Sequence, residues 1–390
     1  MGQWPAALEG VVVADPLSEL TGAFAGRSVF VTGHTGFKGS WLSLWLSRMG
    51  ARVTGYALAP PTDPCAFVAC GVREILAAHH EADIRDSERL NRAMRTCGPD
   101  VVLHLAAQPL VRASYEQPRE TIDVNVVGTA SVLDAVRALG RPCAVIVVTS
   151  DKCYDNHEHV FGYRETDPLG GSDPYSASKG AAEIVVASYR QSFFPPERVK
   201  SHGVRLASVR AGNVIGGGDW AQDRIVADAA RSLSIGQPVP VRNPRSTRPW
   251  QHVLEPLGGY LLLAARMLAA PDDARLADAW NFGPSSLEAV TVGELVDLFV
   301  AAWASGSWKD ASLGEQPHEA RLLRLSIDKA VSQLGWRPRW PVHEAVRRTA
   351  VWYRRYYEQS PAKRNAGAMR ECSLADIADY QAGWKMPAGA

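Results

Sequence analysis

Short apolar runs alternate along the first half of the chain with longer segments in which apolar residues recur every three or four positions. The short runs are typical of buried strands, and the periodic segments are typical of amphipathic helices. The expected strands span residues 27–32, 51–58, 100–105, 144–149 and 203–210, with a further strand just before His80. The expected helices span residues 40–49, 86–97, 120–139, 173–193, 253–268 and 341–357. Apolar strands separated by helices predict a parallel sheet with helices on both faces.

This pattern divides the chain into four parts. Residues 26–210 predict one large, doubly wound α/β domain. After residue 211 glycine and proline become denser and the elements shorter, so residues 211–360 predict a smaller, mixed α/β part that interleaves with the sheet. Residues 361–390 are expected to form a C-terminal tail. Residues 1–25 are expected to form an N-terminal extension, because they lack the basic start and continuous apolar stretch of a signal peptide.

Composition and charge argue against several classes of function. Of the 390 residues 46% are hydrophobic and 21% are charged, and the formal net charge is +1. Such a chain has no general electrostatic attraction for nucleic acid or an anionic membrane, and no apolar run approaches the about 18–20 residues of a membrane span. The six cysteines form no C-x-x-C pair, and the scattered histidines suggest no metal site. We therefore expect reduced thiols, a cytoplasmic location and no bound metal.

A glycine-rich turn follows the first expected strand and leads into the first helix. Its spacing is G-x-x-G-x-x-G, which permits a tight turn, a close approach of the backbone to a pyrophosphate, and close packing of helix on strand. The helix N-terminus adds aligned N–H groups for phosphate. Strand, turn and helix occur in the order that a Rossmann dinucleotide site requires. The residues predicted to bind the cofactor here are Gly33, His34, Thr35, Gly36, Phe37, Lys38 and Gly39.

Two other strand ends are predicted to contact the cofactor. Asp83-Ile84 follows the third strand, where the Asp83 carboxylate could accept from an adenine amino group or cap the next helix. Leu105-Ala106-Ala107 ends the fourth strand with small residues that suit a backbone lying against the cofactor. The second strand ends in Tyr56-Ala57-Leu58, without an acidic residue for a ribose 2′-hydroxyl. We expect NAD as the cofactor, and the residues alone leave NADP open.

Candidate catalytic residues follow the fifth strand, at the sheet edge where open α/β sheets bind ligands. Ser150, Asp151 and Lys152 are consecutive at this strand end. Tyr175 and Lys179 lie four positions apart on the next helix, so they share one helix face. A nearby ammonium favours the phenolate and lowers a tyrosine pKa, which would make Tyr175 a usable base near neutral pH. Tyr175 and Lys179 are also expected to contact the cofactor, and Ser150 could hydrogen-bond the same substrate hydroxyl.

With these residues identified, the sequence resembles the extended short-chain dehydrogenase/reductases that modify nucleotide sugars, and within them the CDP-glucose 4,6-dehydratases. The resemblance covers nearly all of residues 27–357. The segments that carry it are VTGHTGFKGSW at 31–41, SDKCY at 150–154, RAGNVIGGGDW at 210–220, RPWQH at 248–252 and the region 326–338. It implies a hydro-lyase that converts CDP-glucose to CDP-4-keto-6-deoxyglucose.

The resemblance also implies a mechanism. Tyr175 takes the proton of the sugar 4-hydroxyl as hydride leaves C4, water is then lost across C5 and C6, and hydride returns to C6. Asp151 and Lys152 stand where related dTDP-glucose enzymes have an Asp-Glu acid/base pair, and Lys152 agrees with the CDP-glucose type. To act as a base Lys152 must be neutral, and the alternative is that it only pairs with Asp151 or with a phosphate.

Candidate substrate-binding residues gather mainly after the sixth strand, where Arg210 ends the strand. Arginine forks suit the bidentate recognition of a diphosphate, and in the resembling family Asn213 and Arg248 lie along the nucleotide diphosphate. The full expected set is Gln108, Arg112, Asn213, Arg224, Arg242, Arg248 and His252. Trp41 and Trp45 are expected to pack in the core instead of forming a platform for the sugar.

Relatives in the resembling family dimerise through the helices near 120–139 and 173–193, so we expect a homodimer or a homotetramer. Two other functions stay open: another enzyme of this superfamily, such as a 4-epimerase or a 4-ketoreductase, and a non-catalytic nicotinamide-binding regulator. Asp151 and Lys152 favour the dehydratase, because the other two reactions need no acid/base pair for water loss. The presence of Ser150, Tyr175 and Lys179 together argues against the regulator.

Overall fold

A computed structural model describes residues 16–285, 290–312, 322–360, 364 and 367–383. Its centre is a seven-stranded sheet in the order β3-β2-β1-β4-β5-β6-β11, in which every neighbouring pair is parallel. The strands are β1 (Ser28–Thr32), β2 (Arg52–Ala57), β3 (Ala78–Glu81), β4 (Val101–His104), β5 (Cys143–Val148), β6 (Val204–Arg210) and β11 (Ala279–Asn281). The order reverses between β1 and β4, which confirms the predicted doubly wound fold.

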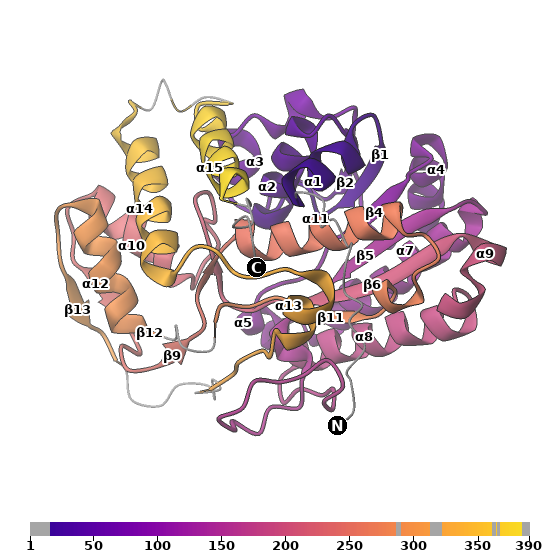
Figure 1. Ribbon diagram of the computed structural model, residues 1–390. Coiled ribbons are helices and arrows are strands. Elements are labelled where there is room, and N and C mark those ends of the chain that lie inside the picture. Colours follow the sequence, from indigo (N-terminus) through magenta and orange to yellow (C-terminus); the bar gives the residue numbers. More distant parts are fainter. Residues whose placement is uncertain (1–15, 286–289, 313–321, 361–363, 365–366, 384–390) are drawn as a thin grey trace, which may run out of the picture.

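Helices cover both faces of this sheet (Figure 1). One face packs against α2 (Phe37–Arg48) and α11 (Leu254–Ala269), and the other against α4 (Ser87–Cys97), α7 (Gly128–Leu139) and α8 (Pro174–Ser192). Side chains of each strand alternate between the two cores, so Val29 and Val31 join the first and Phe30 the second. Because both faces are covered, the central strands β4 and β5 are buried and mostly apolar, which is the pattern that made them predictable.

The expected helix at 120–139 differs in detail from the structure. It consists of α6 (Pro118–Ile122), a π-helical segment at Asp123–Val127 and α7. The π-helical segment places Asn125 so that its side-chain amide donates to the Gln108 carbonyl and to the Ser178 hydroxyl. A π-helical turn often marks a functional region, and here it connects the loop after β4 with α8, the helix that carries Tyr175 and Lys179.

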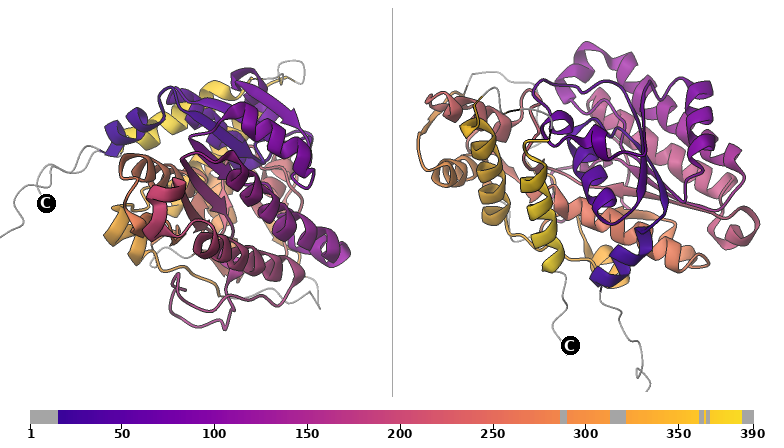
Figure 2. Two further views of the ribbon diagram at one scale, coloured as in Figure 1. Left: turned by 90° about the vertical axis from the view of Figure 1, so that its right-hand side faces the viewer. Right: turned by 90° about the horizontal axis from the view of Figure 1, so that it is seen from above.

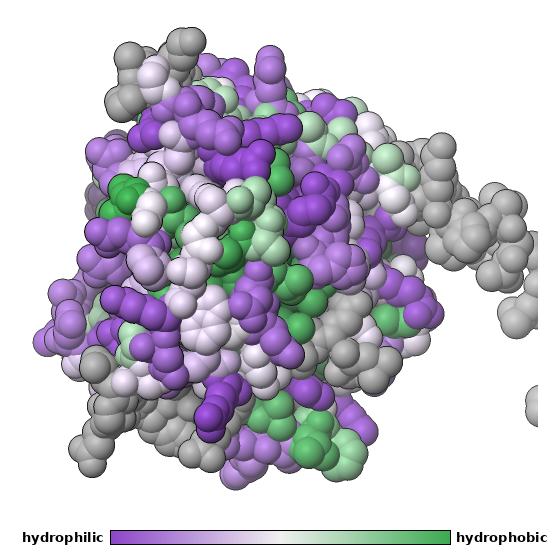
Figure 3. Space-filling model, turned by 90° about the vertical axis from the view of Figure 1, so that its left-hand side faces the viewer, coloured by the Kyte–Doolittle hydropathy of each residue, from purple (hydrophilic) through white to green (hydrophobic). Residues whose placement is uncertain are grey.

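The region after residue 211 contributes to both the sheet and a second lobe. Strand β11 extends the sheet, and α11 covers one of its faces. The second lobe, at the left of Figure 1, is built on α10 (Ile225–Ser234), α12 (Val292–Trp303) and α14 (Val342–Glu358). Three strand pairs join it, namely β7 (Val214–Ile215) with β10 (Gln251–His252), β9 (Thr247–Arg248) with β12 (Val290–Thr291), and β8 (Val239–Val241) with β13 (Trp308–Asp310). The outer face of this lobe is mostly hydrophilic with a smaller apolar area near its middle (Figure 3).

Both ends of the described chain are helices packed on the sheet domain, on the same side of the molecule (Figure 2). In α1 (Pro16–Phe24), Leu20 and Phe24 are fully buried, and this helix contacts α11. In α15 (Arg370–Ala382), Ile377 and Tyr380 are fully buried, and the helix contacts both α2 and α14. The expected extension and tail therefore each contain a segment of the core.

The remaining elements are short or connect the larger ones. They are α3 (Ala66–Ala69), α5 (Val111–Glu116), α9 (Val199–His202) and α13 (Asp328–Leu334), with 3-10 turns at Val72–Ile75, Asp151–Cys153, Pro196–Arg198 and Ala274–Leu276. Within the described ranges, no helix is both long and apolar enough to cross a membrane.

A buried carboxyl group connects two helices and a loop. Glu255, in the first turn of α11, is fully buried and accepts from the Trp340 N–H at 2.7 Å, the Arg339 N–H at 3.1 Å and the Tyr380 hydroxyl at 2.8 Å. Burial raises the pKa of Glu255 to about 7, although these hydrogen bonds act in the opposite direction. The group holds α11, the loop before α14, and α15 together.

We predict that the contribution of Glu255 to the stability of the fold falls as the pH rises from about 4.5 to about 7. Its pKa is higher in the folded chain than in the unfolded chain, so the stabilisation present below the unfolded pKa is lost as the pH rises through the folded pKa. The difference in free energy of unfolding between wild type and E255Q should change by about 3 kcal/mol over this window. Denaturant titrations at several pH values measure this difference.

The control for this measurement is Glu358→Gln, which removes an exposed glutamate at the end of α14. That variant should follow the pH dependence of wild type. Parallel stability curves for wild type and E255Q would contradict the assignment of the slope to Glu255.

Candidate active site

The glycine turn between β1 and α2 has the shape that a dinucleotide pyrophosphate needs. Gly33 has a φ of +74°, and a Cβ atom there would lie 2.7 Å from the Ala106 nitrogen, so only glycine fits. Gly36 caps α2 in an extended conformation without a side-chain hydrogen bond to the helix end. Gly36 thus offers no side chain to cap the N-terminal amides of this 12-residue helix. Such amides are suited to binding a phosphate group.

Two predicted cofactor residues in this turn direct their side chains into the protein. The ring of His34 is fully buried over Gly55, and its Nε2 lies 2.7 Å from Nδ1 of His79. Burial, with His79 beside it, lowers the pKa of His34 to about 3. The Thr35 hydroxyl donates to the Leu58 carbonyl at 2.9 Å. The prediction that His34 and Thr35 bind a cofactor therefore applies to their backbones, because both side chains face the protein.

The other predicted cofactor residues lie at strand ends beside the turn. Thr32 Oγ1 accepts from the N–H groups of Leu105 at 3.1 Å and Ala106 at 3.2 Å, which fixes the 105–107 segment next to the glycine turn. Asp83 does not cap α4, because Asp86 does so. Its carboxylate instead accepts hydrogen bonds from the Arg85 guanidinium. These hydrogen bonds are the main reason why the pKa of Asp83 lies below its usual range. Ile84 is buried against Gly128.

Three of the predicted catalytic side chains meet at the carboxyl end of β5. A 3-10 turn begins at Asp151, directly after the strand, so the chain makes the bend that lets consecutive residues face one site. The Ser150 hydroxyl donates to Asp151 Oδ1 at 3.0 Å, and the same hydroxyl lies near enough to the Tyr175 phenol to lower its pKa. All three side chains are buried.

Asp151 is held in place by close packing as well as by Ser150. A Cβ atom on Gly212 would lie 2.1 Å from Asp151 Oδ2, so the carboxylate occupies the space that any larger residue at 212 would take. Gly212 follows β6 and was part of the segment that carried the family resemblance. The sequence alone does not predict that Gly212 packs against the Asp151 carboxylate.

The electrostatics of Tyr175 differ from the expectation. Burial raises the pKa of Tyr175 to about 12, and Asp151 acts in the same direction, whereas Ser150 and Arg224 lower it. The predicted lowering by Lys179 is therefore wrong for this state of the protein, since the loss of hydration outweighs the neighbouring cations. Arg224, which sequence reasoning placed only at the diphosphate, is one of the cations that act on Tyr175.

Two lysines influence the charge of the site, the buried Lys179 and the half-buried Lys38. Burial lowers the pKa of Lys179 to about 8, and the positive charge of Lys38 acts in the same direction. Burial also lowers the pKa of Lys38 to about 8, and the Asp151 carboxylate partly restores it. The side chain of Lys152 is half-buried, and its backbone N–H donates to Ser150 Oγ at 3.2 Å. Lys38 was predicted only as a cofactor ligand, yet it is the lysine whose charge acts on Lys179.

A buried network beneath the site fixes the catalytic helix. Glu183, one turn after Lys179 on α8, accepts from Thr149 at 2.5 Å, from Ser208 at 2.7 Å and from Arg210 at 2.8 Å. Arg210, which ends β6, is buried, and its guanidinium is bound to Glu183 and to the Tyr154 hydroxyl.

Two expected substrate-binding residues are occupied elsewhere. The side-chain amide of Gln108 donates to Thr121 at 2.8 Å, and its oxygen accepts from the Leu110 N–H at 2.6 Å. His252 is buried between the rings of Trp41 and Trp340, and burial lowers its pKa to about 3. The polar atoms of Gln108 therefore serve the loop and the His252 ring belongs to the core, whereas substrate binding by these two residues stays a prediction.

The remaining substrate candidates lie where the two lobes face each other. Arg112 on α5 and Arg242 after β8 both contact the carboxylate of Asp223. Arg224 lies near Asp219 at 3.9 Å, Arg248 forms part of β9, and the carbonyl of Asn213 accepts from the Gln251 N–H. As expected for core residues, Trp41 and Trp45 are buried.

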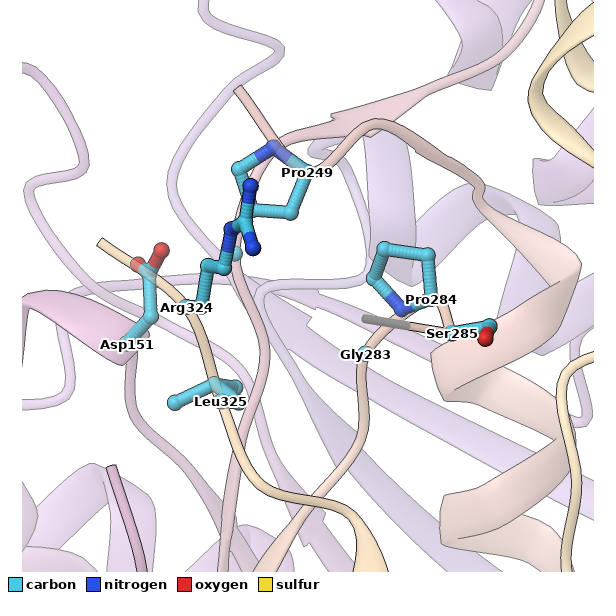
Figure 4. Close-up of a pocket in the computed structure, with 8 residues that line it drawn as sticks. Asp151, Pro249, Gly283, Pro284, Ser285, Arg324 and Leu325 are labelled. Carbon is cyan, nitrogen blue, oxygen red and sulfur yellow. The ribbon is translucent and has the colours of Figure 1, made fainter. Parts of the chain in front are cut away.

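Sequence reasoning missed one wall of the site. A pocket beside Asp151 is lined by Gly212, Pro249, Gly283, Pro284, Ser285, Arg324 and Leu325. The Arg324 and Asp151 side chains enter it from segments far apart in the sequence (Figure 4). Residues 283–285 follow β11 at the carboxyl edge of the sheet, so recognising that strand would have pointed to them. Among the described residues, no group of three or more metal-ligating side chains lies together.

Comparison with known proteins agrees with this arrangement. The model of the GDP-mannose 4,6 dehydratase family matches residues 30–349. The CDP-glucose 4,6-dehydratase of Salmonella typhimurium strain LT2 is 50% identical over 355 residues, which cover 91% of this chain and 96% of that protein.

Solved structures share the fold. The dTDP-glucose 4,6-dehydratase of Streptomyces venezuelae, solved with NAD bound, has a TM-score of 0.68 at 23% identity and covers 84% of this chain and 96% of that one. The UDP-glucose 4-epimerase of Thermus thermophilus, in complex with NAD, has a TM-score of 0.68 at 27% identity and covers 84% of this chain and 98% of that one. The family match and the 50% identity show that the chain belongs to the nucleotide-sugar 4,6-dehydratases of the extended short-chain dehydrogenase/reductase family.

Proposed function

We propose that this chain is an NAD-dependent CDP-glucose 4,6-dehydratase that forms CDP-4-keto-6-deoxyglucose and water. The observation that carries the proposal is the cluster of Ser150, Asp151 and Tyr175, which combines a hydroxyl pair suited to oxidation with a carboxyl group suited to elimination. The name of the relative that is 50% identical supports CDP-glucose as the substrate.

The oxidative step is assigned to Tyr175. Its phenol lies near the Ser150 hydroxyl, so a sugar 4-hydroxyl that contacts both can pass its proton to Tyr175. Because burial keeps the pKa of Tyr175 near 12, the phenolate needs positive charge nearby, and Arg224 supplies part of it. Lys179, buried on the same helix face, adds a further cation when protonated. Bound NAD would supply reversible acceptance of the hydride from C4.

The elimination step is assigned to Asp151 and Lys152. The 4-ketone acidifies the C5 hydrogen, so one group must accept that proton and another must donate to the departing 6-hydroxyl. The 3-10 turn brings both residues out of the strand, and Asp151 is fixed between Ser150 and Gly212. The two residues divide the acceptor and donor roles at one sugar.

The cofactor assignment to NAD rests on the solved relatives that carry it. The residues that would hold it are those of the glycine turn at 33–39 and the 105–107 segment. The second strand ends at Ala57, and the segment Tyr56-Ala57-Leu58 has no acidic side chain that could bind a ribose hydroxyl. The Leu58 carbonyl accepts from the Thr35 hydroxyl. We infer that residues 26–210 mainly bind the cofactor and carry the catalytic groups, and that 211–360 mainly bind the substrate.

We also infer a homodimer, with a tetramer as the alternative, and a cytoplasmic location. Exposed apolar side chains on the helices expected at the interface support the dimer, namely Ile122, Val127 and Ile184. Large apolar residues exposed on neighbouring helices are typical of a contact between subunits. All six cysteines are unbridged, which supports a reducing compartment.

We predict that Tyr175→Phe folds and binds cofactor but loses about 10²–10⁴-fold in rate, the usual contribution of a positioned acid/base. Tyr189→Phe removes a hydroxyl further along the same helix and serves as the matched control, with a rate close to wild type. The rate is measured with CDP-glucose as the appearance of product lighter by the mass of one water. Wild-type turnover in Tyr175→Phe would remove this residue from the mechanism.

We predict that the redox cycle is closed. Hydride taken from C4 returns to C6, so a catalytic amount of NAD should support complete conversion of the substrate without net accumulation of reduced nicotinamide. Absorbance and product mass are followed in the same reaction, across CDP-, dTDP-, GDP- and UDP-hexoses. Stoichiometric accumulation of NADH would indicate an ordinary dehydrogenase instead.

We predict that Asp151→Asn and Lys152→Met keep the oxidation but lose the elimination. In single turnover NADH should appear and persist, while dehydrated product falls steeply, because oxidation at C4 does not require either side chain. If Lys152→Met dehydrates at the normal rate, the C5 base is another group. Lys38, which the Asp151 carboxylate influences directly, would then be replaced by methionine in the same assay.

A further inference from the structure

Asp223 connects two arginines that come from different halves of the protein. Its Oδ1 lies 3.3 Å from Nη1 of Arg112 on α5 and 2.5 Å from Nη2 of Arg242, which follows β8. A single carboxylate oxygen therefore faces two guanidinium groups across the interface of the lobes. About a third to a half of each of the three side chains is exposed, at 52% for Arg112, 41% for Asp223 and 35% for Arg242.

The position of Asp223 is set by the loop that carries it. Within the loop the Gly217 carbonyl accepts from the Trp41 indole, and the Asp219 carbonyl accepts from the Tyr353 hydroxyl, so both lobes anchor it. Asp223 itself has a φ of +59°, in the left-handed region that aspartate and asparagine tolerate better than most residues. The carboxylate is thus presented to the two arginines by an anchored backbone.

The next residue, Arg224, acts electrostatically on the reaction centre. Arg224 affects the pKa of both Tyr175 and Lys38, so the Asp223 carboxylate lies one residue away from the cations that surround the site. Carboxylates and phosphates are recognised by guanidinium groups through the same geometry. Arg112 and Arg242, the two arginines that Asp223 engages, are both among the residues that the sequence predicts to bind the nucleotide sugar.

We propose that the Asp223 carboxylate is an internal stand-in for the diphosphate of the substrate. It neutralises Arg112 and Arg242 when no nucleotide is bound, and the diphosphate displaces it when a nucleotide sugar enters. This inference depends on the proposed function in one respect, namely that the ligand contains a nucleoside diphosphate. The competition weakens the binding of every diphosphate by the same factor, whatever its base, and so speeds the release of product.

The test is the affinity of Asp223→Asn for cytidine diphosphate, measured by calorimetry on the full chain. Asparagine keeps the left-handed backbone accessible and removes only the charge, and Asp223→Gly provides a second variant compatible with that backbone. Removing the competitor should tighten binding about three- to tenfold, as expected for the loss of two partly exposed ion pairs. The gain should be similar for uridine and guanosine diphosphates, absent for uncharged cytidine, and smaller at high salt.

Two controls separate this competition from a general change in charge. Asp272→Asn removes an exposed carboxylate that pairs with Lys200 at 3.4 Å, beyond the end of α11, and should leave the affinity unchanged. Arg242→Gln should weaken binding, and adding Asp223→Asn to it should give a smaller gain than in wild type. Unchanged or weaker binding in Asp223→Asn, an equal gain in Asp272→Asn, or failure of wild type to bind any of the diphosphates would overturn the proposal.

Dehydration of CDP-glucose is measured separately on the same preparations. If wild type does not dehydrate CDP-glucose but Asp223→Asn tightens the diphosphates, the proposed function fails and the stand-in remains. If wild type dehydrates CDP-glucose and the affinity does not respond to Asp223→Asn, the stand-in fails and the function remains.

Discussion

The ion pair between Glu183 and Arg210 is the contact on which the geometry of the active site depends. It joins the catalytic helix α8 to β6, and the hydroxyls of Thr149 and Ser208 complete the shell of the carboxylate. Burial opposes ionisation, but Arg210 and these hydroxyls hold the pKa of Glu183 below its ordinary value. Separating α8 from β6 would leave each charge of this pair buried without its partner, which is costly. The helix and the strand are therefore held in one relative position.

The same pair extends the order of the site outward. Arg210 also donates to the Tyr154 hydroxyl, which donates to Asn281 in β11, and the Asn281 amide donates to the carbonyls of Tyr163 and Ser326. The backbone of Arg324 pairs with Tyr163 in turn. The pocket wall beside Asp151 and the helix that carries Tyr175 are therefore positioned by one continuous hydrogen-bonded network.

The parts of this protein that sequence reasoning predicts well are those whose residues have one physical explanation. The run at 144–149 is apolar because β5 is covered on both faces, and the glycine turn is fixed by its steric needs. Strand β11 was missed because Ala279-Trp280-Asn281 is too short and mixed to show a period. Asp223 had no signal, since its meaning depends on Arg112 and Arg242 arriving from distant segments. His252 was expected to bind the substrate because it is a polar residue near Arg248 in the sequence. In the structure its ring packs between Trp41 and Trp340.

Strand β11 and the helices α11 and α15 have a consequence for how the protein is made. The six strands from β1 to β6 have all been synthesised by residue 210, but the helix that covers one face of their sheet ends only at residue 269. Helix α2 waits longer still for α15, which is completed at residue 382. Val29, Val31 and Ile146 belong to the uncovered core face. The nascent chain therefore leaves the part of this sheet face that α11 covers open to water or to a chaperone until residue 269 has been synthesised.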